Sequence, residues 1–289
     1  MTIITELAPA KINLTLEVLG RRADGYHELR SLVAFARDAA DNVALDTSRP
    51  AGSSVTGPFG ATIAGQNLID LTLGKLAAAD PHLQLGHVTL TKNLPVAAGI
   101  GGGSADAAAV LRAARRANPD RAAAIDWHAL ALSLGADVPV CLSNAAAWMS
   151  GIGDKIEPAA TLPLISAVLV NPLQPMPADK TAQVFRSLNA GPYQADSRHA
   201  APAPFASPAD LIAYAKRGNT LDGAASSVAP IIADVKHAIA QLPNVRHAAL
   251  SGAGPTCFGL FDTFEQAKLA AEQLAAEHPK WWVKPTRLT

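Results

Sequence analysis

Apolar and polar residues alternate near the start of the chain. The apolar positions are Ile12, Leu14, Leu16 and Val18, and the polar positions are Lys11, Asn13, Thr15 and Glu17. A period of two is typical of a strand with one buried face, so Lys11 and Asn13 are expected together on the opposite face. A lysine exposed on such a strand is ordinary, and the alternation alone favours a solvated Lys11.

The same reading along the rest of the chain predicts an α+β fold. In the first half it predicts strands at residues 27–35, 43–45 and 87–92, a Gly/Pro/Ser-rich loop at 48–60, and helices at 67–79, 105–117 and 126–134. In the second half it predicts strands at 164–170, 247–251, 257–261 and 281–284, and helices at 180–188, 228–242 and 264–278. The second half should form an antiparallel sheet covered on one face by helices. The pattern restarts near residue 160, which predicts domains at 1–160 and 161–289.

A glycine-rich segment runs directly into one of these helices. Residues 95–109 read Pro-Val-Ala-Ala-Gly-Ile-Gly-Gly-Gly-Ser-Ala-Asp-Ala-Ala-Ala. Without Cβ atoms, successive backbone N–H groups converge easily on one point, and Ser104 is placed to cap the helix. A helix start preceded by glycines is an anion site suited to polyphosphate. The alternative is a glycine turn that lets a helix pack close to a strand, but such a turn needs fewer glycines, so the phosphate interpretation is favoured.

The glycine segment differs from three better-known motifs. Ala105 follows Gly103-Ser104, where a Walker A loop continues with Lys. Ser104 also stands where the dinucleotide fingerprint needs its third glycine. Asp106 occupies the position of the last glycine in the nucleophile elbow of hydrolases. The segment therefore argues against a Walker-type NTPase, a dinucleotide oxidoreductase and a hydrolase of that fold.

Two further segments have the composition of functional sites. Asp137 is the only charged residue between His128 and Asp154. A buried carboxylate is costly unless it is paired, so Asp137 either pairs with a cation such as Lys11 or accepts backbone N–H bonds in its turn; the sequence leaves both open. The segment Leu250-Ser-Gly-Ala-Gly-Pro-Thr-Cys-Phe258 predicts a hairpin turn. In a phosphate-binding protein it would instead bring backbone close to the phosphates.

Composition excludes several classes of protein. The 289 residues carry 24 basic and 24 acidic side chains without a basic run, which argues against a nucleic-acid surface. The longest apolar run is too short to span a bilayer, and the N-terminus lacks the basic region of a signal peptide. Cytoplasmic localisation without membrane contact is therefore expected. Cys141 and Cys257 are isolated and are predicted to be buried free thiols.

Several motifs together resemble a known family. Pro9-Ala-Lys-Ile-Asn-Leu14, the glycine segment and Ser251-Gly-Ala-Gly-Pro-Thr256 occur in this order and resemble the three motifs of the GHMP kinases. Within that superfamily, Arg22-Ala-Asp-Gly-Tyr-His27 and Leu134-Gly-Ala-Asp-Val-Pro139 resemble the branch that phosphorylates 4-diphosphocytidyl-2-C-methyl-D-erythritol in non-mevalonate isoprenoid biosynthesis. The resemblance spans nearly the whole chain. It implies an N-terminal α/β domain of ribosomal-protein type, a C-terminal ferredoxin-like α+β domain, and an active site in the cleft between them.

The resemblance implies an ATP-dependent transfer to the 2-hydroxyl of that substrate, with ATP and Mg²⁺ as cofactors. Lys11 and Asp137 match the catalytic pair. The ATP-binding positions are Pro95, Val96, Ala97, Ala98, Gly99, Ile100, Gly101, Gly102, Gly103, Ser104 and Ala105. Ser104 is, by analogy only, a candidate hydroxyl ligand of Mg²⁺.

The resemblance also implies residues for the second substrate. Tyr26 matches a residue that stacks on the cytosine, and His27 one that hydrogen-bonds the base edge. Phe185 matches a second stacking aromatic, and Asn13 a contact to the methylerythritol part. The partners are then this small molecule and ATP; the sequence leaves a monomer or a homodimer open.

Two segments depart from the family pattern, and two alternatives remain. The segment Asn219-Thr-Leu-Asp222 stands where Asn-Asp-Leu-Glu is expected, so no role is assigned to it. Ala97-Ala98 stand where relatives often have glycine, which restricts the backbone conformations that the loop can adopt. The alternatives are another small-alcohol kinase, such as a homoserine or phosphomevalonate kinase, and a non-catalytic nucleotide-binding module. Aromatic residues suited to stacking on a nucleobase argue against another small-alcohol kinase. The Lys–Asp pair argues against a non-catalytic module, which would need neither residue.

Overall fold

The computed structural model describes residues 3–62, 67–159, 161–177, 179–195 and 204–289. Helices and strands occur in separate runs along the chain rather than in strict alternation, which confirms the predicted α+β class. The chain forms two compact units. The first unit comprises Met1–Ala10, Ala39–Val96 and Gly101–Asn144, and the second comprises Lys11–Asp38, Ala97–Ile100 and Ala145–Thr289. The predicted division of the sequence at residue 160 stays a prediction.

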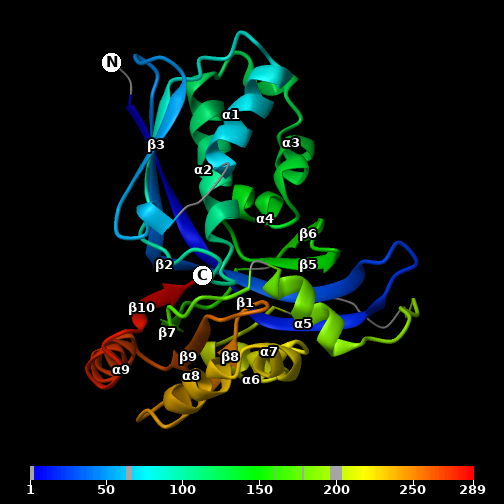
Figure 1. Cartoon of the computed structure of the whole chain (residues 1–289), viewed down its shortest axis with the longest axis vertical. Coiled ribbons are helices and arrows are strands. Elements are labelled where there is room, and N and C mark those ends of the chain that lie inside the picture. The colour runs from blue at the N-terminus through cyan, green and yellow to red at the C-terminus, as the bar shows by residue number, and fades with distance from the viewer. Residues whose placement is uncertain (1–2, 63–66, 160, 178, 196–203) are drawn as a thin grey trace. The chain divides into compact units, whose positions relative to one another are not determined.

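The first unit contains a small sheet and four helices that pack against one another. The C-terminal part of β2 (His27–Asp46) pairs antiparallel with β4 (His87–Thr91), and β3 (Gly52–Thr56) pairs in parallel with β4. The helices are α1 (Leu68–Ala79), α2 (Gly102–Ala117), α3 (Trp127–Leu134) and α4 (Val138–Ser143), with short 3₁₀ turns at Gly60–Thr62 and Ala122–Ala124. Figure 1 shows the four helices together, coloured cyan to green.

The sequence of α2 explains its central place among these helices. Its buried residues are mostly alanines, which lose no side-chain entropy in a helix and let neighbouring helices approach closely. Both α1 and α4 pack against it. The adjacent helix α3 begins as predicted, because the Asp126 side chain accepts a hydrogen bond from the amide of Ala129. Gly135 ends α3, also as predicted.

The second unit is built on an antiparallel sheet. Its strands follow the order β10 (Trp282–Leu288), β7 (Ile165–Asn171), β9 (Cys257–Phe261) and β8 (His247–Leu250). Helices α8 (Ile231–Ala240) and α9 (Phe264–Glu277) pack on this sheet. The unit also contains α5 (Lys180–Leu188), α6 (Pro208–Ala215) and α7 (Asp222–Val228). The bounds of α5 and β9 agree with the sequence prediction.

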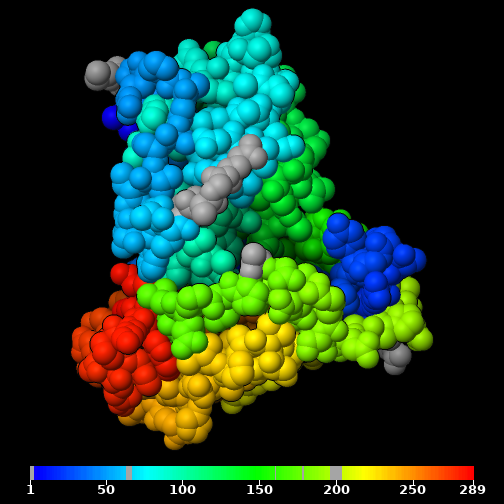
Figure 2. All heavy atoms as spheres, in the orientation of Figure 1, coloured from blue at the N-terminus to red at the C-terminus, as the bar shows by residue number. Residues whose placement is uncertain are grey.

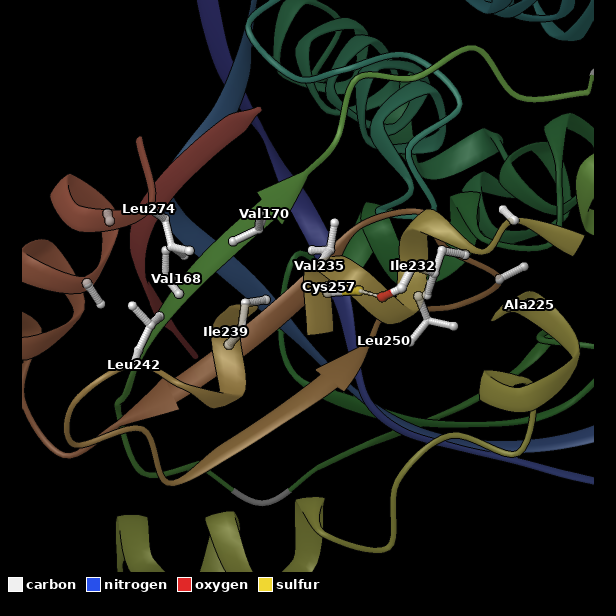
Figure 3. Close-up of a cluster of buried hydrophobic side chains, with 14 of the residues drawn as sticks. Val168, Val170, Ala225, Ile232, Val235, Ile239, Leu242, Leu250, Cys257 and Leu274 are labelled. Atoms are coloured by element: carbon white, nitrogen blue, oxygen red, sulfur yellow. Dashed lines mark hydrogen bonds between the residues drawn. The ribbon is translucent and has the colours of Figure 1, made fainter. Parts of the chain in front are cut away.

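Apolar side chains from this sheet and its helices converge in one core (Figure 3). Val168 and Val170 of β7 face Val235 and Ile239 of α8. Cys257 lies in the same core, with its thiol sulfur 3.9 Å from the carbonyl oxygen of a residue in α8. Burial raises the pKa of the Cys257 thiol. Cys141 and Cys257 are both buried, and neither forms a disulfide within the described residues, which confirms the prediction of two buried thiols.

The long strands β1 (Ile3–Arg21) and β2 pair with each other, and their connecting turn projects beside another segment. The Arg21 amide donates to the Gly191 carbonyl at 2.8 Å, and the Tyr193 amide donates to the Arg21 carbonyl at 2.8 Å. Figure 2 shows this blue turn next to the yellow-green segment that follows α5. In the same unit, β5 (Ala147–Gly151) pairs with β2, and β6 (Lys155–Pro158) pairs with β5.

Several elements were wrong or missing in the sequence prediction. The strands predicted at 27–35 and 43–45 are one strand, β2, and the predicted loop at 48–60 contains β3. The short elements α4, β5, β6, α6 and α7 were not predicted. Elements of four to eight residues carry too few positions to establish a period. Their structure depends instead on partners that lie far away in the sequence.

Candidate active site

Lys11 and Asn13 lie side by side on β1 within the second unit. The Lys11 ammonium donates to Asn13 Oδ1 at 3.1 Å. Asn13 Nδ2 donates to Ser31 Oγ at 2.7 Å, and the Asn13 amide donates to Ser251 Oγ at 3.2 Å. Lys11 is 4% exposed and Asn13 3%, so the prediction of a half-buried strand with a solvated Lys11 is wrong. Asn13 is covered by Ser31 of the neighbouring strand β2 and by the turn at Ser251, which both hydrogen-bond to it.

The turn at residues 251–256 binds residues 97–100 of the glycine segment through hydrogen bonds to their backbone carbonyls. The Thr256 amide donates to the Ala98 carbonyl at 3.1 Å, and Ser251 Oγ donates to the Gly99 carbonyl at 3.4 Å. On the other side, the Lys11 amide donates to the Ile100 carbonyl at 2.9 Å. The parts of the three motifs that belong to this unit, residues 11–14, 97–100 and 251–256, are therefore in contact. The predicted hairpin turn is confirmed, because β8 and β9 pair antiparallel on either side of it. The interpretation of this segment in isolation did not include its contact with residues 97–100.

Gly99 is the point of closest approach between the two turns. A Cβ atom at Gly99 would lie 2.4 Å from the Gly254 carbonyl oxygen, and its φ is +76°. Both the contact and the left-handed conformation require glycine. The same Gly254 carbonyl accepts a hydrogen bond from the Lys180 ammonium, at the start of α5. Burial lowers the pKa of Lys180 to about 8.

Gly99→Ala is expected to destabilise the fold by about 1–3 kcal/mol or more, because the new methyl group meets backbone and φ stays positive. Ala97 provides a matched control, since it is exposed and has a φ of 54°. Ala97→Gly should relieve strain and leave the free energy of unfolding unchanged or raised. Urea unfolding of both variants measures the difference. Equal stabilities for the two variants would contradict the assignment of Gly99 as the contact point.

Two residues that hold the second turn were missed in the sequence. Asn219 Nδ2 donates to the Leu250 carbonyl at 3.0 Å and to the Gly252 carbonyl at 2.7 Å. Asn219 thus has a structural role in a segment to which the sequence analysis assigned none. Lys180 is 5% exposed and likewise bonds this turn. Lys180 has no local sequence signal, because it is separated from the turn by tens of positions, whereas Asn219 matches the first residue of the family segment at 219–222.

In the first unit, the glycine segment continues as the N-terminus of α2. The helix begins at Gly102, and its N-cap is Gly101 with a φ of 63°. The prediction that Ser104 caps the helix is wrong: Ser104 is the third helical residue, because left-handed Gly101 lets the helix begin earlier. No side chain within the described ranges caps this terminus. The amides of the first turn, which have no intrahelical acceptors, are therefore suited to an anion.

Asp137 occupies a short turn between two helices of the first unit. It follows Gly135 at the end of α3, is half-buried, and is the N-cap residue of α4. Within the described part of the chain, the Asp137 side chain accepts no capping hydrogen bond from α4. Lys11 and Asp137 belong to different units, and their pairing stays a prediction.

The three predicted base-binding residues line one cavity of the second unit, with a volume of about 810 Å³. Tyr26 directly precedes β2, His27 is the first residue of β2, and Phe185 lies in α5. The His27 and Phe185 rings lie 4.9 Å apart, measured between centroids, at an angle of 31°. Burial, together with the charge of Arg21, lowers the pKa of His27. The cavity therefore presents aromatic faces beside an imidazole that stays neutral at pH 7.

Two domain descriptions match the chain. Residues 67–145 match the GHMP kinases N terminal domain, and residues 208–280 match the GHMP kinases C terminal domain. A crystal structure of homoserine kinase from Cytophaga hutchinsonii covers the whole chain and 95% of its own length, with a TM-score of 0.68 at 15% identity. At that identity the similarity concerns the fold alone. The class is that of the two-domain GHMP kinases.

Relatives narrow the class further. The 4-diphosphocytidyl-2-C-methyl-D-erythritol kinase of Azorhizobium caulinodans is 46% identical, and the alignment covers 97% of each chain. The protein of that name from Paramagnetospirillum magneticum is 43% identical over 100% of this chain and 99% of the relative. A crystal structure of 4-(cytidine 5'-diphospho)-2C-methyl-D-erythritol kinase has a TM-score of 0.77 at 33% identity, covering 99% of both chains. The chain belongs to this kinase family, the 4-diphosphocytidyl-2-C-methyl-D-erythritol kinases.

Within the described ranges, no helix combines the length and apolar character needed to cross a membrane.

Proposed function

We propose that this chain transfers the γ-phosphoryl group of ATP to the 2-hydroxyl of 4-diphosphocytidyl-2-C-methyl-D-erythritol. The products are the 2-phosphate and ADP, in the methylerythritol phosphate route to isopentenyl diphosphate, and the reaction takes place in the cytoplasm, where ATP is supplied. The observation that carries the substrate assignment is the cavity that gathers Tyr26, His27 and Phe185. Homoserine and phosphomevalonate contain no nucleobase that could stack on these aromatic side chains.

The first turn of α2 is the proposed contact for the ATP phosphates. The amides of Gly102, Gly103 and Ser104 carry the positive end of the helix dipole. Residues 95–101 and Ala105 form the rest of the proposed ATP-binding segment. Phosphoryl transfer depends on positioning and on stabilising charge more than on covalent chemistry. Backbone donors fixed in advance therefore meet its main requirement.

Ser104 is the residue proposed to hold Mg²⁺ with the phosphates. It lies in the first turn of α2 and is half-buried, and a hydroxyl oxygen is a donor that this hard cation accepts. When bound, Mg²⁺ neutralises phosphate charge that develops during transfer. Kinases commonly hold Mg²⁺ through one or two carboxylates plus the substrate phosphates, and in P-loop enzymes a serine or threonine hydroxyl is one of the ligands.

Asp137 and Lys11 are the proposed groups for the reacting hydroxyl. Asp137 accepts the proton of the attacking 2-hydroxyl, and Lys11 favours the ionised carboxylate and stabilises the developing alkoxide. In a loose transition state the proton leaves late, so an ordinary carboxylate is a sufficient base. Asn13 is proposed to contact the methylerythritol part, and its bond to the Lys11 ammonium orients that side chain.

His27 supports recognition of cytosine in particular. Because its pKa is lowered by burial and by Arg21, its imidazole is neutral at pH 7 and offers one donor and one acceptor. The pairing edge of cytosine presents an amino donor beside acceptor atoms. The donor and the acceptor of the neutral imidazole are therefore both complementary to groups on this edge. Tyr26 and Phe185 are proposed to stack on the faces of the base.

Tyr26→Ala is expected to raise KM for the cytidylyl substrate by the equivalent of about 1–3 kcal/mol of lost stacking. The KM for ATP should stay unchanged. Tyr26 is 61% exposed, so its truncation leaves the fold intact. Tyr26→Phe keeps the aromatic ring and serves as the control, with a KM near that of the wild type. An unchanged KM for Tyr26→Ala would remove this residue from the base site.

The function is tested by ADP release from Mg·ATP with a panel of acceptors. The panel contains the cytidylyl substrate, homoserine, phosphomevalonate and galactose. Turnover confined to the cytidylyl substrate supports the proposal. Turnover of homoserine or phosphomevalonate would overturn the substrate assignment, and nucleotide binding without any turnover would favour a non-catalytic module.

A further inference from the structure

A buried charged cluster lies beneath the start of α2 in the first unit. It consists of Asp41 on β2, Lys92 directly after β4, and Asp106 in α2. The Lys92 ammonium lies 2.5 Å from Asp41 Oδ2 and 2.6 Å from Asp106 Oδ2. Asp41 is fully buried, and Lys92 and Asp106 are each 3% exposed. Charges this deep are costly unless they are paired, and the Lys92 ammonium pairs with both carboxyl groups.

Asp41 holds the chain that enters the glycine segment. Its second oxygen, Oδ1, accepts hydrogen bonds from the amides of Asn93 and Leu94, at 2.5 and 2.8 Å. The Asn93 side chain donates in addition to the Ala40 carbonyl at 3.2 Å. Both oxygens of Asp41 are thus engaged, one with the backbone before Pro95 and the other with the Lys92 ammonium.

Lys92 connects this entry point to the first turn of α2. Its backbone is fixed by the Thr56 carbonyl, which accepts from the Lys92 amide at 2.8 Å, and by the Phe59 amide, which donates to the Lys92 carbonyl at 3.1 Å. A Cβ atom at Gly102 would lie 3.2 Å from the Lys92 ammonium nitrogen. The ammonium therefore lies directly against the first helical residue, while it also binds Asp106 one turn later.

We propose that Asp41, Lys92 and Asp106 form a positioning cluster that fixes both ends of the glycine segment for nucleotide binding. Within the cluster, Asp41 is indispensable and Asp106 is replaceable by its amide. The inference rests on the proposed function of this segment as the ATP loop. The three side chains act through the backbone at residues 93–94 and 102–106.

The hydrogen bonds make the two carboxylates unequal. An asparagine at position 41 places its NH₂ group against a donor in either orientation, since one side faces backbone amides and the other faces the Lys92 ammonium. At position 106 only Oδ2 is engaged; among the described residues Oδ1 has no hydrogen-bond partner. An amide there keeps an oxygen on Lys92 and meets no opposing donor. It also removes the second carboxylate beside a single ammonium.

Asp41→Asn and Asp106→Asn form an isosteric pair for the test. Asp41→Asn should raise Kd for Mg·ADP and KM for ATP by about 10–100-fold, while KM for the cytidylyl substrate stays close to wild type. Asp106→Asn should bind nucleotide with nearly wild-type affinity. In the absence of nucleotide, hydrogen exchange should accelerate at the amides of Asn93 and Leu94 in Asp41→Asn only. That exchange measurement decides the positioning role even if the cytidylyl substrate proves not to be the acceptor.

Wild-type nucleotide affinity in a folded Asp41→Asn, or equal losses in both variants, would overturn the proposal. If Asp41→Asn does not fold, Lys92→Gln replaces it, because glutamine keeps an NH₂ donor for the carboxylates but is shorter than lysine. A weaker Kd for Mg·ADP in that variant supports the cluster, and an unchanged Kd overturns it. Thermal unfolding of each variant separates loss of affinity from loss of fold.

Discussion

Asp137→Asn is expected to lower kcat by about 10²–10⁴-fold and to leave Kd for Mg·ATP unchanged. The amide keeps the size of the side chain but does not accept the hydroxyl proton. Because Asp137 is half-buried and makes no capping bond to α4 in the described part of the chain, the substitution should not unravel that helix. Steady-state kinetics with the cytidylyl substrate and calorimetric titration with the nucleotide measure the two effects.

Asp120→Asn is the matched control, since Asp120 is an exposed carboxylate of the same unit. Its kcat should equal that of the wild type. Full turnover in Asp137→Asn would show that another group accepts the proton. A loss of nucleotide affinity that equals the loss of kcat would instead place Asp137 in binding.

Lys11→Met is the second substitution with a large expected effect. Removing a donor that stabilises a developing negative charge costs about 10²–10³-fold in kcat. Methionine preserves the straight side chain in a site where Lys11 is 4% exposed, and Asn13 loses its bond to the ammonium. The expected signature is a fall in kcat with a retained melting temperature.

Lys280→Met is the control for removal of a positive charge, because Lys280 is exposed in the same unit as Lys11. It should leave kcat unchanged. A Lys11→Met enzyme that retains most of its turnover would refute the role of Lys11 at the reacting hydroxyl. Recovery of activity in Lys11→Arg would show that charge alone is sufficient there.

Much of the secondary structure was predictable because its signals are local. The bounds of α5 and β9 were predicted correctly, and Asp126 and Gly135 begin and end α3 as expected. Local signals misled at Ser104, where a serine before an alanine run resembles an N-cap. Gly101 adopts a left-handed conformation instead, and the helix begins two residues earlier than Ser104.

The candidate site was predictable where a residue belongs to a motif and not where it acts through space. Lys11, Asn13 and the glycine turns were found because they form recognisable segments. The contacts of Lys180 with Gly254 and of Asn219 with residues 250–252 join positions far apart in the sequence. Asp41, Lys92 and Asp106 likewise come from three separate elements. No local period marks such residues.

The sequence by itself determined the α+β class, the family and the order of the motifs, because these depend on residue types at short fixed spacings. Only the tertiary structure decided that Lys11 is buried, that Gly99 lies against Gly254, and that one cavity gathers Tyr26, His27 and Phe185. The physical reason is that burial, close approach and charge pairing are properties of surfaces brought together by folding. The spacing of residues along the chain therefore does not predict burial, close approach or charge pairing.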